Sequence, residues 1–288
     1  MDSWPWKIAL VLAIVGVREF VRMLSPKDNA GETVENSRWA IETLDSAAIA
    51  IGLVLFVIQP FLLQAFYIPS GSMEDTLQVR DRLLVSKLVY RLRDPKFQDV
   101  VVFRAPTAAL GPNTPDGTDF IKRCIGTPGD IVYVKDRQLY RVAQGAARAV
   151  KITEPYTKWS PSSAENIGLS QSYDFKIIGG EVFSREYAIP GEPGVWKING
   201  VPQPEGEQQQ ITDAKPEAVP ADHFLMLGDH RNNSNDGHVW GFVPRENVVG
   251  KAVCVFWPPN RLSLVDRLSH PKVPDPIRTA NLALPVTP

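Results

Sequence analysis

The chain has 288 residues, enough for about two domains of ordinary size. Its 31 lysines and arginines balance 32 aspartates and glutamates, so it lacks the basic excess typical of proteins that coat nucleic acids, and we expect no nucleic-acid partner. The 25 prolines exceed the usual share of roughly 5% and disfavour a helical bundle. The two cysteines, Cys124 and Cys254, are too few for a disulfide scaffold and do not form a C-x-x-C pair. They lie 130 positions apart on two predicted strands, so we expect two buried free thiols.

Apolar residues are concentrated near the N-terminus. Residues 46–66, SAAIAIGLVLFVIQPFLLQAF, contain no charge. About 20 apolar residues in a helix span the hydrocarbon core, so the segment predicts a transmembrane helix in preference to a buried core helix. A shorter stretch, residues 8–17, favours a first anchor over residues 4–20, with an interfacial helix as the alternative. No small-residue cleavage site follows it, which argues against a removed signal peptide.

The charge pattern predicts the orientation of these segments. Basic residues lie between the two apolar stretches and indicate a cytoplasmic loop; they are Arg18, Arg22, Lys27 and Arg38. Further basic residues soon after the second stretch reduce this asymmetry, but long domains cross a membrane largely regardless of such charges. We therefore expect the residues after Phe66 on the outer side of the membrane.

The rest of the chain is predicted to be mainly β. Short segments rich in β-branched and aromatic residues are separated by Gly, Pro, Asn and Asp. They are residues 82–88, 99–103, 119–125, 131–135, 138–142, 223–227 and 248–257. Because no amphipathic helices alternate with them, a β sandwich or barrel-like domain is favoured over a doubly wound α/β sheet.

Five regions follow from these patterns. Residues 1–45 form the N-terminal anchor and loop, residues 46–66 the transmembrane helix and residues 67–257 a β-rich domain. Within that domain, residues 154–219 are predicted to be an irregular insertion that includes a hairpin with its turn at Asn199 and Gly200. Residues 258–288 hold seven prolines and are predicted to be extended or disordered.

The segment directly after the predicted span, residues 67–77, contains two serines in a PSGS turn. Serines in turns are usually structural. Six residues separate Phe66 from Ser72, and an extended chain covers at most ~3.6 Å per residue, so Ser72 lies within roughly 20 Å of the membrane end of the span. A nucleophile at that position would meet substrates that are themselves in the membrane.

A serine nucleophile needs a base, and two kinds are available. His230 and His238 lie near Asp229 and Asp236, which offers a Ser-His-Asp triad, although the sequence has no G-x-S-x-G motif. The same loop could also be considered as a metal site, but its spacings match no zinc or calcium motif. The other base is Lys122, within an apolar strand, where burial would lower its pKa. The structural alternative is a lysine that reaches solvent from a sheet edge.

Five segments in order resemble the bacterial type I signal peptidases, the membrane-bound serine proteases that remove signal peptides. They are IPSGSM, DRLLVSKLVY, QDVVVFRAP, FIKRCIGTPGD and LGDHRNNSNDGHVWGFVP. The resemblance covers residues 66–130 and 220–257. It implies an antiparallel β catalytic domain of the signal-peptidase-I type behind one or two transmembrane helices. It also implies a monomeric hydrolase without a metal or organic cofactor, located in the bacterial cytoplasmic membrane with its catalytic domain outside.

The resemblance also implies roles for individual residues. Ser72 corresponds to the nucleophile and Lys122 to the general base of a Ser/Lys dyad. Ser70 corresponds to the hydroxyl that joins the Ser72 backbone N–H in the oxyanion hole, and Ser234 to the serine that orients the lysine amine. Supporting polar residues and the apolar lining of the substrate pockets correspond to Arg123, Asp229 and Asp236, and to Ile68, Met73, Leu77 and Ile121.

The sequence departs from the family pattern at several positions. Asp75 stands where the family usually has Pro, and Gln98 where it usually has Gly. His230, Gly237 and His238 replace the commoner Asn, Ser and Arg. A histidine at position 238 is expected to pair less firmly with Asp236 than an arginine could.

The implied activity is cleavage of exported pre-proteins after an A-x-A-like site, with signal peptides and membrane lipid as partners. One alternative is a catalytically impaired, membrane-tethered binding or assembly protein on the same scaffold. Another is a protein that cleaves itself by Ser/Lys chemistry. The retention of both dyad residues and their supporting groups favours the enzyme, and the membrane anchor argues against the self-cleaving alternative.

Overall fold

The computed structural model describes residues 4–25, 35–112, 114–160, 172–187 and 194–269. The chain divides into two compact units, residues 1–64 and residues 65–288. Each is described by itself below.

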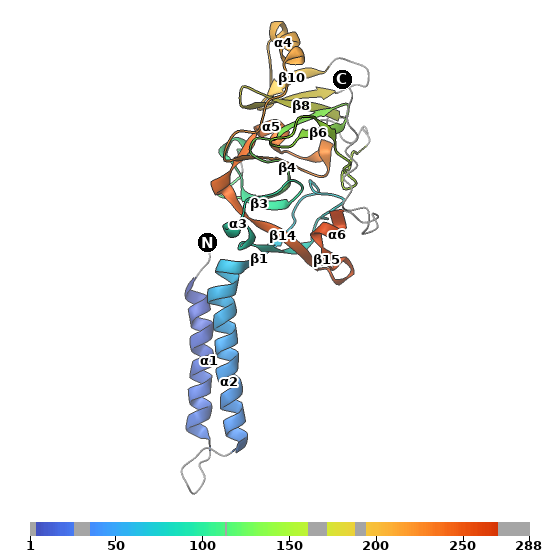
Figure 1. Ribbon diagram of the computed structural model, residues 1–288. Helices are drawn as coiled ribbons and strands as arrows, with labels where there is room; N and C mark the ends of the chain where they lie inside the picture. Colours follow the sequence, from blue (N-terminus) through green and yellow to red (C-terminus); the bar gives the residue numbers. More distant parts are fainter. Residues whose placement is uncertain (1–3, 26–34, 113, 161–171, 188–193, 270–288) are drawn as a thin grey trace. The chain divides into compact units, whose positions relative to one another are not determined.

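The first unit is a pair of packed helices, α1 (Trp4–Leu24) and α2 (Glu35–Leu53), followed by a π-helical stretch, η1 (Val54–Leu62) (Figure 1). An ion pair joins the two helices, with Arg18 Nε 3.0 Å from Asp45 Oδ1. Within the described residues, one helical segment is long and apolar enough to cross a membrane, Arg38–Phe56, with a mean hydropathy of 1.6. That α1 also spans the membrane stays a prediction.

The helical segment differs from the predicted range of 46–66. It begins earlier, at Glu35, and ends at Leu62, after which Leu63–Tyr67 forms the strand β1. The change from α to π backbone occurs over a stretch that contains Pro60, which has no N–H to donate to the helix. The last residues of the predicted span therefore belong to a sheet.

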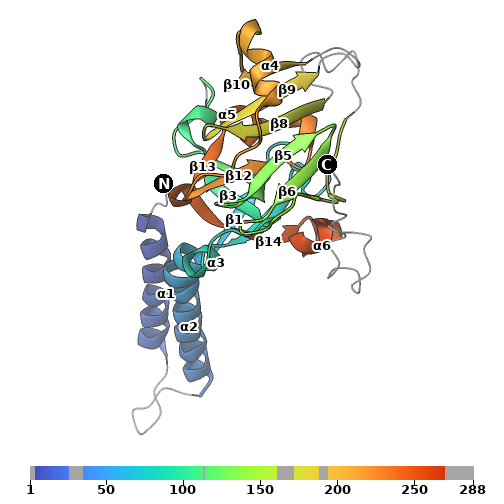
Figure 2. The same cartoon turned by 45° about the horizontal axis from the view of Figure 1, so that its top comes forward.

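The second unit is built from two mainly antiparallel sheets (Figures 1 and 2). The first has the order β1-β2-β14-β3-β4-β12-β13, with β15 paired to β14. Its further strands are β2 (Arg82–Ser86), β3 (Val100–Arg104), β4 (Asp119–Gly126), β12 (His223–Leu227), β13 (Phe242–Pro244), β14 (Val248–Trp257) and β15 (Ser263–Leu264). Short helical elements lie between them: α3 (Val89–Leu92), η2 (Thr107–Ala109), η4 (Arg231–Asn233), α5 (Gly237–Trp240) and η5 (Arg245–Asn247).

The second sheet has the order β11-β10-β9-β8-β5-β6-β7. Its strands are β5 (Ile131–Lys135), β6 (Gln138–Val142), β7 (Val150–Lys151), β8 (Ser172–Ile178), β9 (Glu181–Tyr187), β10 (Val195–Ile198) and β11 (Val201–Pro202), followed by η3 (Glu205–Glu207) and α4 (Gln208–Asp213). One apolar core contains residues from both sheets, among them Leu225 and Leu227 from the first and Val132 and Phe175 from the second. This shared core fixes the loop after β12 against the second sheet.

All seven strands predicted from the sequence are present, within two residues at each end. The predicted hairpin turn is also confirmed, since Asn199 and Gly200 adopt φ values of 49° and 76° between β10 and β11. The prediction of an irregular insertion over 154–219 is wrong for its described part. Four strands of the second sheet lie there, because their apolar residues complete the core shared with the first sheet.

The prediction for the tail also needs correction. Residues 258–269 form η6 (Pro259–Arg261), β15 and α6 (Val265–Ser269), while the remaining tail, residues 270–288, lies outside the described residues. The side chain of Val265 is fully buried in the core beneath β2 and β14, and Arg261 Nη2 lies 2.9 Å from Asp81 Oδ2. The prolines punctuate this segment without preventing it from packing. Both cysteines are free, as predicted, and Cys124 is buried, but the prediction of burial is wrong for Cys254, which is partly exposed.

Candidate active site

Ser72 lies in a turn that is closed by backbone hydrogen bonds. The Ile68 N–H donates to Asp81 O at 2.9 Å, and the Arg80 N–H donates to Ile68 O at 2.9 Å, so residues 68 and 81 bring the two ends of the turn together. Within the turn, the Leu77 N–H donates to Met73 O at 2.8 Å. The turn is therefore fixed on both sides of the serine.

Apolar side chains hold this turn on the sheet. Ile68, Met73 and Leu77, which were predicted to line substrate pockets, have at most 2% of their surface exposed. They pack with Leu83 and other residues of the core, so in this structure they form the floor under the serine turn rather than open pocket walls. Ile121, the fourth predicted lining residue, packs at the edge of the same core and stays partly exposed.

Lys122 faces this turn from the middle of β4. Its backbone is paired with Val101 of β3, and its Nζ lies 2.7 Å from Ser72 Oγ. The side chain is 5% exposed. The structure therefore brings together the two residues that the sequence proposed as nucleophile and base.

Burial lowers the pKa of Lys122 to about 8, although the carboxylates of Asp236 and Asp229 oppose this shift. An amine with that pKa is largely neutral slightly above pH 8 and can accept a proton from a hydroxyl. The alternative of a lysine that reaches solvent from a sheet edge is wrong for Lys122, because the residue is only 5% exposed and its Nζ contacts Ser72 Oγ.

The loop after β12 closes over the serine turn at Gly228. A Cβ on Gly228 would lie 2.6 Å from the Ser72 backbone oxygen and would also collide with Ser234, so glycine is required for this approach. The Ser234 hydroxyl is buried and makes no hydrogen bond within the described residues. The predicted contact between Ser234 and the lysine amine is therefore not formed in this structure. Ser70, the other predicted hydroxyl, is exposed.

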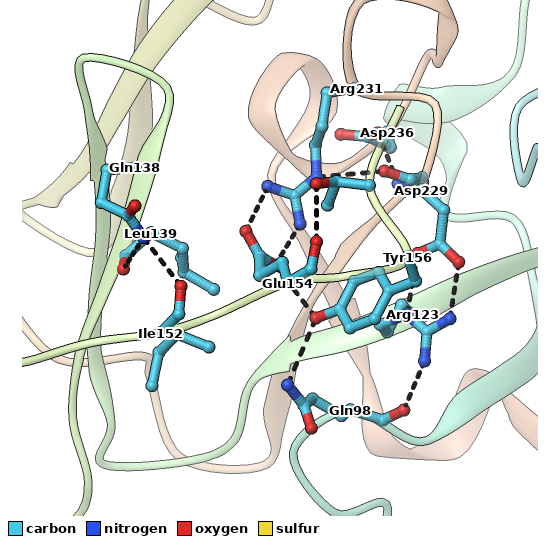
Figure 3. A network of polar contacts seen from close by, with 12 residues as sticks. Gln98, Arg123, Gln138, Leu139, Ile152, Glu154, Tyr156, Asp229, Arg231 and Asp236 are labelled. Atoms are coloured by element: carbon cyan, nitrogen blue, oxygen red, sulfur yellow. Dashed lines mark hydrogen bonds and ion pairs between the residues drawn. The ribbon is translucent and has the colours of Figure 1, made fainter. Parts of the chain in front are cut away.

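Asp229 forms a buried, bidentate ion pair with Arg123 (Figure 3). Arg123 Nε lies 2.7 Å from Oδ1 and Nη2 lies 2.5 Å from Oδ2. Thr76 donates its hydroxyl proton to the same carboxylate at 2.6 Å. Because Thr76 belongs to the serine turn and Arg123 to β4, the aspartate connects both dyad elements to the loop after β12.

Arg123 is held by further groups. Its guanidinium stacks 3.8 Å from the ring centre of Tyr156, and its Nη1 donates to the Gln98 backbone oxygen at 3.0 Å (Figure 3). Its Nη2 also donates to Ser269 Oγ at 3.0 Å. Gln98 adopts a φ of 69°, a conformation that glycine reaches without strain, which explains why glycine suits this position in the family.

Asp236 caps the short helix α5 and fixes the same loop. Its carboxylate accepts hydrogen bonds from the Gly228 N–H at 2.7 Å and from the His238 ring at 2.7 Å. Burial alone would raise the pKa of Asp236, but His238 and these hydrogen bonds bring it below its usual value. The His238 ring stacks on Tyr173 at 3.9 Å between ring centres, so β8 of the second sheet supports the pair.

The structure does not form a Ser-His-Asp triad. The His230 ring contacts Ser160 Oγ, at 2.6 Å from Nε2, and the Gly71 backbone oxygen, at 3.3 Å from Nδ1, rather than Ser72 Oγ. The His238 ring contacts Asp236. In the part of the chain that the structure describes, no three His, Cys, Asp or Glu side chains gather in a way that could hold a metal ion.

Residues 154–160 were not predicted to belong to the site. Glu154 forms a buried ion pair with Arg231, and Lys158 Nζ lies 3.1 Å from Glu74 and 3.2 Å from Asp75 (Figure 3 shows the first pair). The lysine therefore neutralises the aspartate that stands where the family usually has proline. No local motif marked this segment, because its partners lie more than 70 residues away in the sequence.

Comparison with known proteins places these observations in a family. The model of the family described as "Signal peptidase, peptidase S26" matches residues 38–257. The chain is 37% identical over 220 residues to the signal peptidase I of Leptolyngbya laminosa, covering 75% of this chain and 77% of that one. It is 32% identical over 310 residues to the signal peptidase I of Pseudomonas aeruginosa, covering 93% and 97%. A crystal structure of a signal peptidase I from Enterococcus faecalis V583 is 23% identical, with a TM-score of 0.30 over 55% of this chain and 97% of that chain.

Proposed function

Because the chain belongs to the signal peptidase family, peptidase S26, we propose that it removes N-terminal signal peptides from exported pre-proteins by means of a Ser/Lys dyad, Ser72 and Lys122. The observation that carries this proposal is the 2.7 Å distance between Ser72 Oγ and the buried Lys122 Nζ. The lowered pKa of the amine, about 8, supports its role as a base.

The proposed reaction has two stages. Lys122 Nζ accepts the proton of the Ser72 hydroxyl while Oγ attacks the scissile carbonyl carbon, and the peptide C–N bond then breaks as the leaving amine receives that proton. Lys122 next takes a proton from a water molecule, whose oxygen attacks the acyl ester; the ester C–Oγ bond then breaks as Lys122 returns that proton to Ser72 Oγ, and the carboxyl product leaves. The exposed Ser70 hydroxyl and the Ser72 N–H are the proposed donors to the oxyanion. Loss of one such donor typically costs 10²–10³-fold in rate.

The open edge of β4 supports a binding mode for the substrate. Strand β12 pairs with β4 at positions 123–126, whereas β3 pairs with positions 119–123 on the other side. The edge of β4 before Arg123 therefore remains for an extended peptide, which would add as a strand between it and residues 67–70. Small residues at the last and third-last positions before the cleavage site, the A-x-A pattern, suit a pocket whose floor is already filled by Met73 and Leu77.

The apolar helical segment supports a membrane location. Arg38–Phe56 is long and apolar enough to span, and the serine turn follows it closely in the chain. Together with the basic residues between the two apolar stretches of the sequence, this favours a bacterial cytoplasmic membrane protein whose second unit faces the outer side. Signal peptides, which lie in that membrane, would then reach Ser72.

The test is cleavage of a purified pre-protein with an A-x-A site by the detergent-solubilised full chain. Wild type is expected to release the mature protein, Ser72→Ala is expected to release none, and Ser263→Ala serves as a matched loss of a hydroxyl away from the turn. Equal cleavage by wild type and Ser72→Ala would overturn the assignment. Binding of the pre-protein by wild type without cleavage would favour the impaired binding protein instead.

A further inference from the structure

Residues 154–160 lie directly against the loop that carries the supporting residues of the dyad. The Lys158 N–H donates to Asp229 O at 2.8 Å, and the Arg231 N–H donates to Lys158 O at 2.9 Å. These two bonds form a short parallel bridge centred on His230. Residues 154–160 thus pair with the backbone of the loop after β12 in the way that a neighbouring strand would.

The segment is also tied at both of its ends. At Glu154 the carboxylate pairs with Arg231, whose Nη1 lies 2.9 Å away, and both side chains are buried. At Ser160 the backbone forms a reciprocal pair with the Asn232 amide, which accepts from the Ser160 N–H at 3.0 Å and donates to the Ser160 oxygen at 2.8 Å. Residues 154–160 are therefore held against the loop after β12 by one buried ion pair and four hydrogen bonds to their backbone.

His230 connects this segment to the nucleophile. Its ring Nε2 lies 2.6 Å from Ser160 Oγ, its ring Nδ1 lies 3.3 Å from the Gly71 oxygen, and its backbone N–H donates to Ser72 O at 3.1 Å. One residue therefore holds the two consecutive carbonyl groups around the serine turn. The Ser160 hydroxyl contacts the opposite side of the ring, at Nε2.

The surroundings of the ring assign its proton. Nδ1 faces two acceptors, the Gly71 oxygen at 3.3 Å and Glu74 Oε2 at 3.7 Å, and one donor, Asn233 Nδ2 at 3.4 Å. Burial lowers the pKa of His230 and nearby Lys158 acts in the same direction, which favours the neutral ring, while the Gly71 hydrogen bond and the charges of Glu74 and Asp75 oppose this shift. The ring then donates from Nδ1 to Gly71 and accepts the Ser160 hydroxyl proton at Nε2, an assignment made from the hydrogen-bond network.

We propose that residues 154–160 form a positioning element of the active site, in which Ser160 orients His230 and His230 holds the Gly71–Ser72 backbone. This inference rests on the proposed function, because the held group is its nucleophile. Displacement of a reacting group by about 1 Å can cost 10²-fold in rate, so a hydrogen bond that fixes this turn affects turnover more than substrate binding.

Substitutions at His230 separate the two ring contacts. The amide of Asn occupies the region of Nδ1, whereas the amide of Gln reaches the region of Nε2. In cleavage of a peptide with an A-x-A site, His230→Ala is expected to lower kcat at least tenfold with KM changed less than about twofold. His230→Asn is expected to restore kcat to within about threefold of wild type, and His230→Gln to behave like the alanine variant. Full kcat in His230→Ala, or equal kcat in the Asn and Gln variants, would overturn the proposal.

Ser160 is tested through its coupling to His230. Ser160→Ala is expected to lower kcat several-fold in the wild-type background, because the ring loses the partner that fixes its proton. The same substitution is expected to have little effect in the His230→Asn background, where no Nε2 exists. An equal loss of kcat in both backgrounds would mean that Ser160 acts on stability alone and would contradict the proposed chain of contacts.

Two controls keep the outcomes distinct. Ser263→Ala removes a hydroxyl whose one hydrogen bond among the described residues is to the neighbouring Leu264 backbone oxygen, and it should keep wild-type kcat and KM. The melting temperatures of the His230 variants, compared with that of the wild type, show whether a loss of activity comes from unfolding. Recovery of kcat in His230→Asn is the second check. If wild type and Ser72→Ala cleave equally, the proposed function fails; if only Ser72→Ala is inactive and the His230 series is uniform, the positioning inference alone fails.

Discussion

Lys122 Nζ lies 2.7 Å from Ser72 Oγ, and both carboxylates that attract the lysine charge also bind other side chains. Asp229 is paired with Arg123, and Asp236 with His238. Burial therefore outweighs the attraction and lowers the pKa of the amine to about 8. The ion pairs around the dyad thus leave the lysine able to lose its proton.

The lowered pKa predicts how activity depends on pH. Below pH 8 the neutral fraction of Lys122 falls about tenfold for each pH unit. We therefore expect kcat/KM to rise with pH and to level off above an apparent pKa of about 8. Steady-state cleavage between pH 6 and pH 10 measures this limb. A limb near pH 6.5 that disappears in His230→Ala would identify a histidine base instead.

Lys122→Met should abolish cleavage and increase stability at neutral pH. Below pH 8 the buried amine of Lys122 is charged, which destabilises the folded state. The shift of its pKa from 10.5 to about 8 corresponds to a destabilisation on the order of 3 kcal/mol. Between pH 8 and pH 10.5 Lys122 is protonated in the unfolded state but mostly neutral in the folded state. The stability of the wild type therefore rises with pH over this range, and the difference in stability between the Met variant and the wild type becomes smaller. Thermal unfolding at pH 7 and pH 10 tests this. A variant less stable than wild type at pH 7 would contradict the burial argument.

Asp229→Asn should destabilise the fold and impair cleavage together. It leaves the Arg123 guanidinium buried without its counter-ion, and breaking a buried pair in this way typically costs about 3–5 kcal/mol. The double substitution Arg123→Met, Asp229→Leu removes both charges and should recover much of the lost stability without restoring activity. Urea unfolding and peptide cleavage measured on the same samples separate the two effects; equal destabilisation in the single and double variants would speak against the ion pair.

Ser234→Ala should leave stability within about 0.5 kcal/mol of wild type, since the buried hydroxyl has no partner among the described residues. If this hydroxyl engages the Lys122 amine during the reaction, as the family resemblance implies, kcat should fall about tenfold or more. The measurement is kcat at pH 8 together with the melting temperature. An unchanged kcat would remove Ser234 from the proposed mechanism.

The strands were predictable because their evidence is local. Alternating β-branched and aromatic residues mark β4 and β14 regardless of what packs on them. The residues of β8 and β9 escaped prediction because their regularity depends on the core that they share with the first sheet. The tail was misjudged for a similar reason, since Val265 is buried by residues distant in the sequence.

The sequence by itself determined the chemical types at the site: a serine after an apolar span, a lysine within an apolar strand, and a polar loop rich in Asp and His. It left the choice of base open between lysine and histidine from the residues alone. The tertiary structure favours the lysine, because it places Lys122 Nζ 2.7 Å from Ser72 Oγ, whereas the rings of His230 and His238 contact other groups. It also decided that residues 154–160 hold the loop around His230, a contact between segments with no shared local pattern.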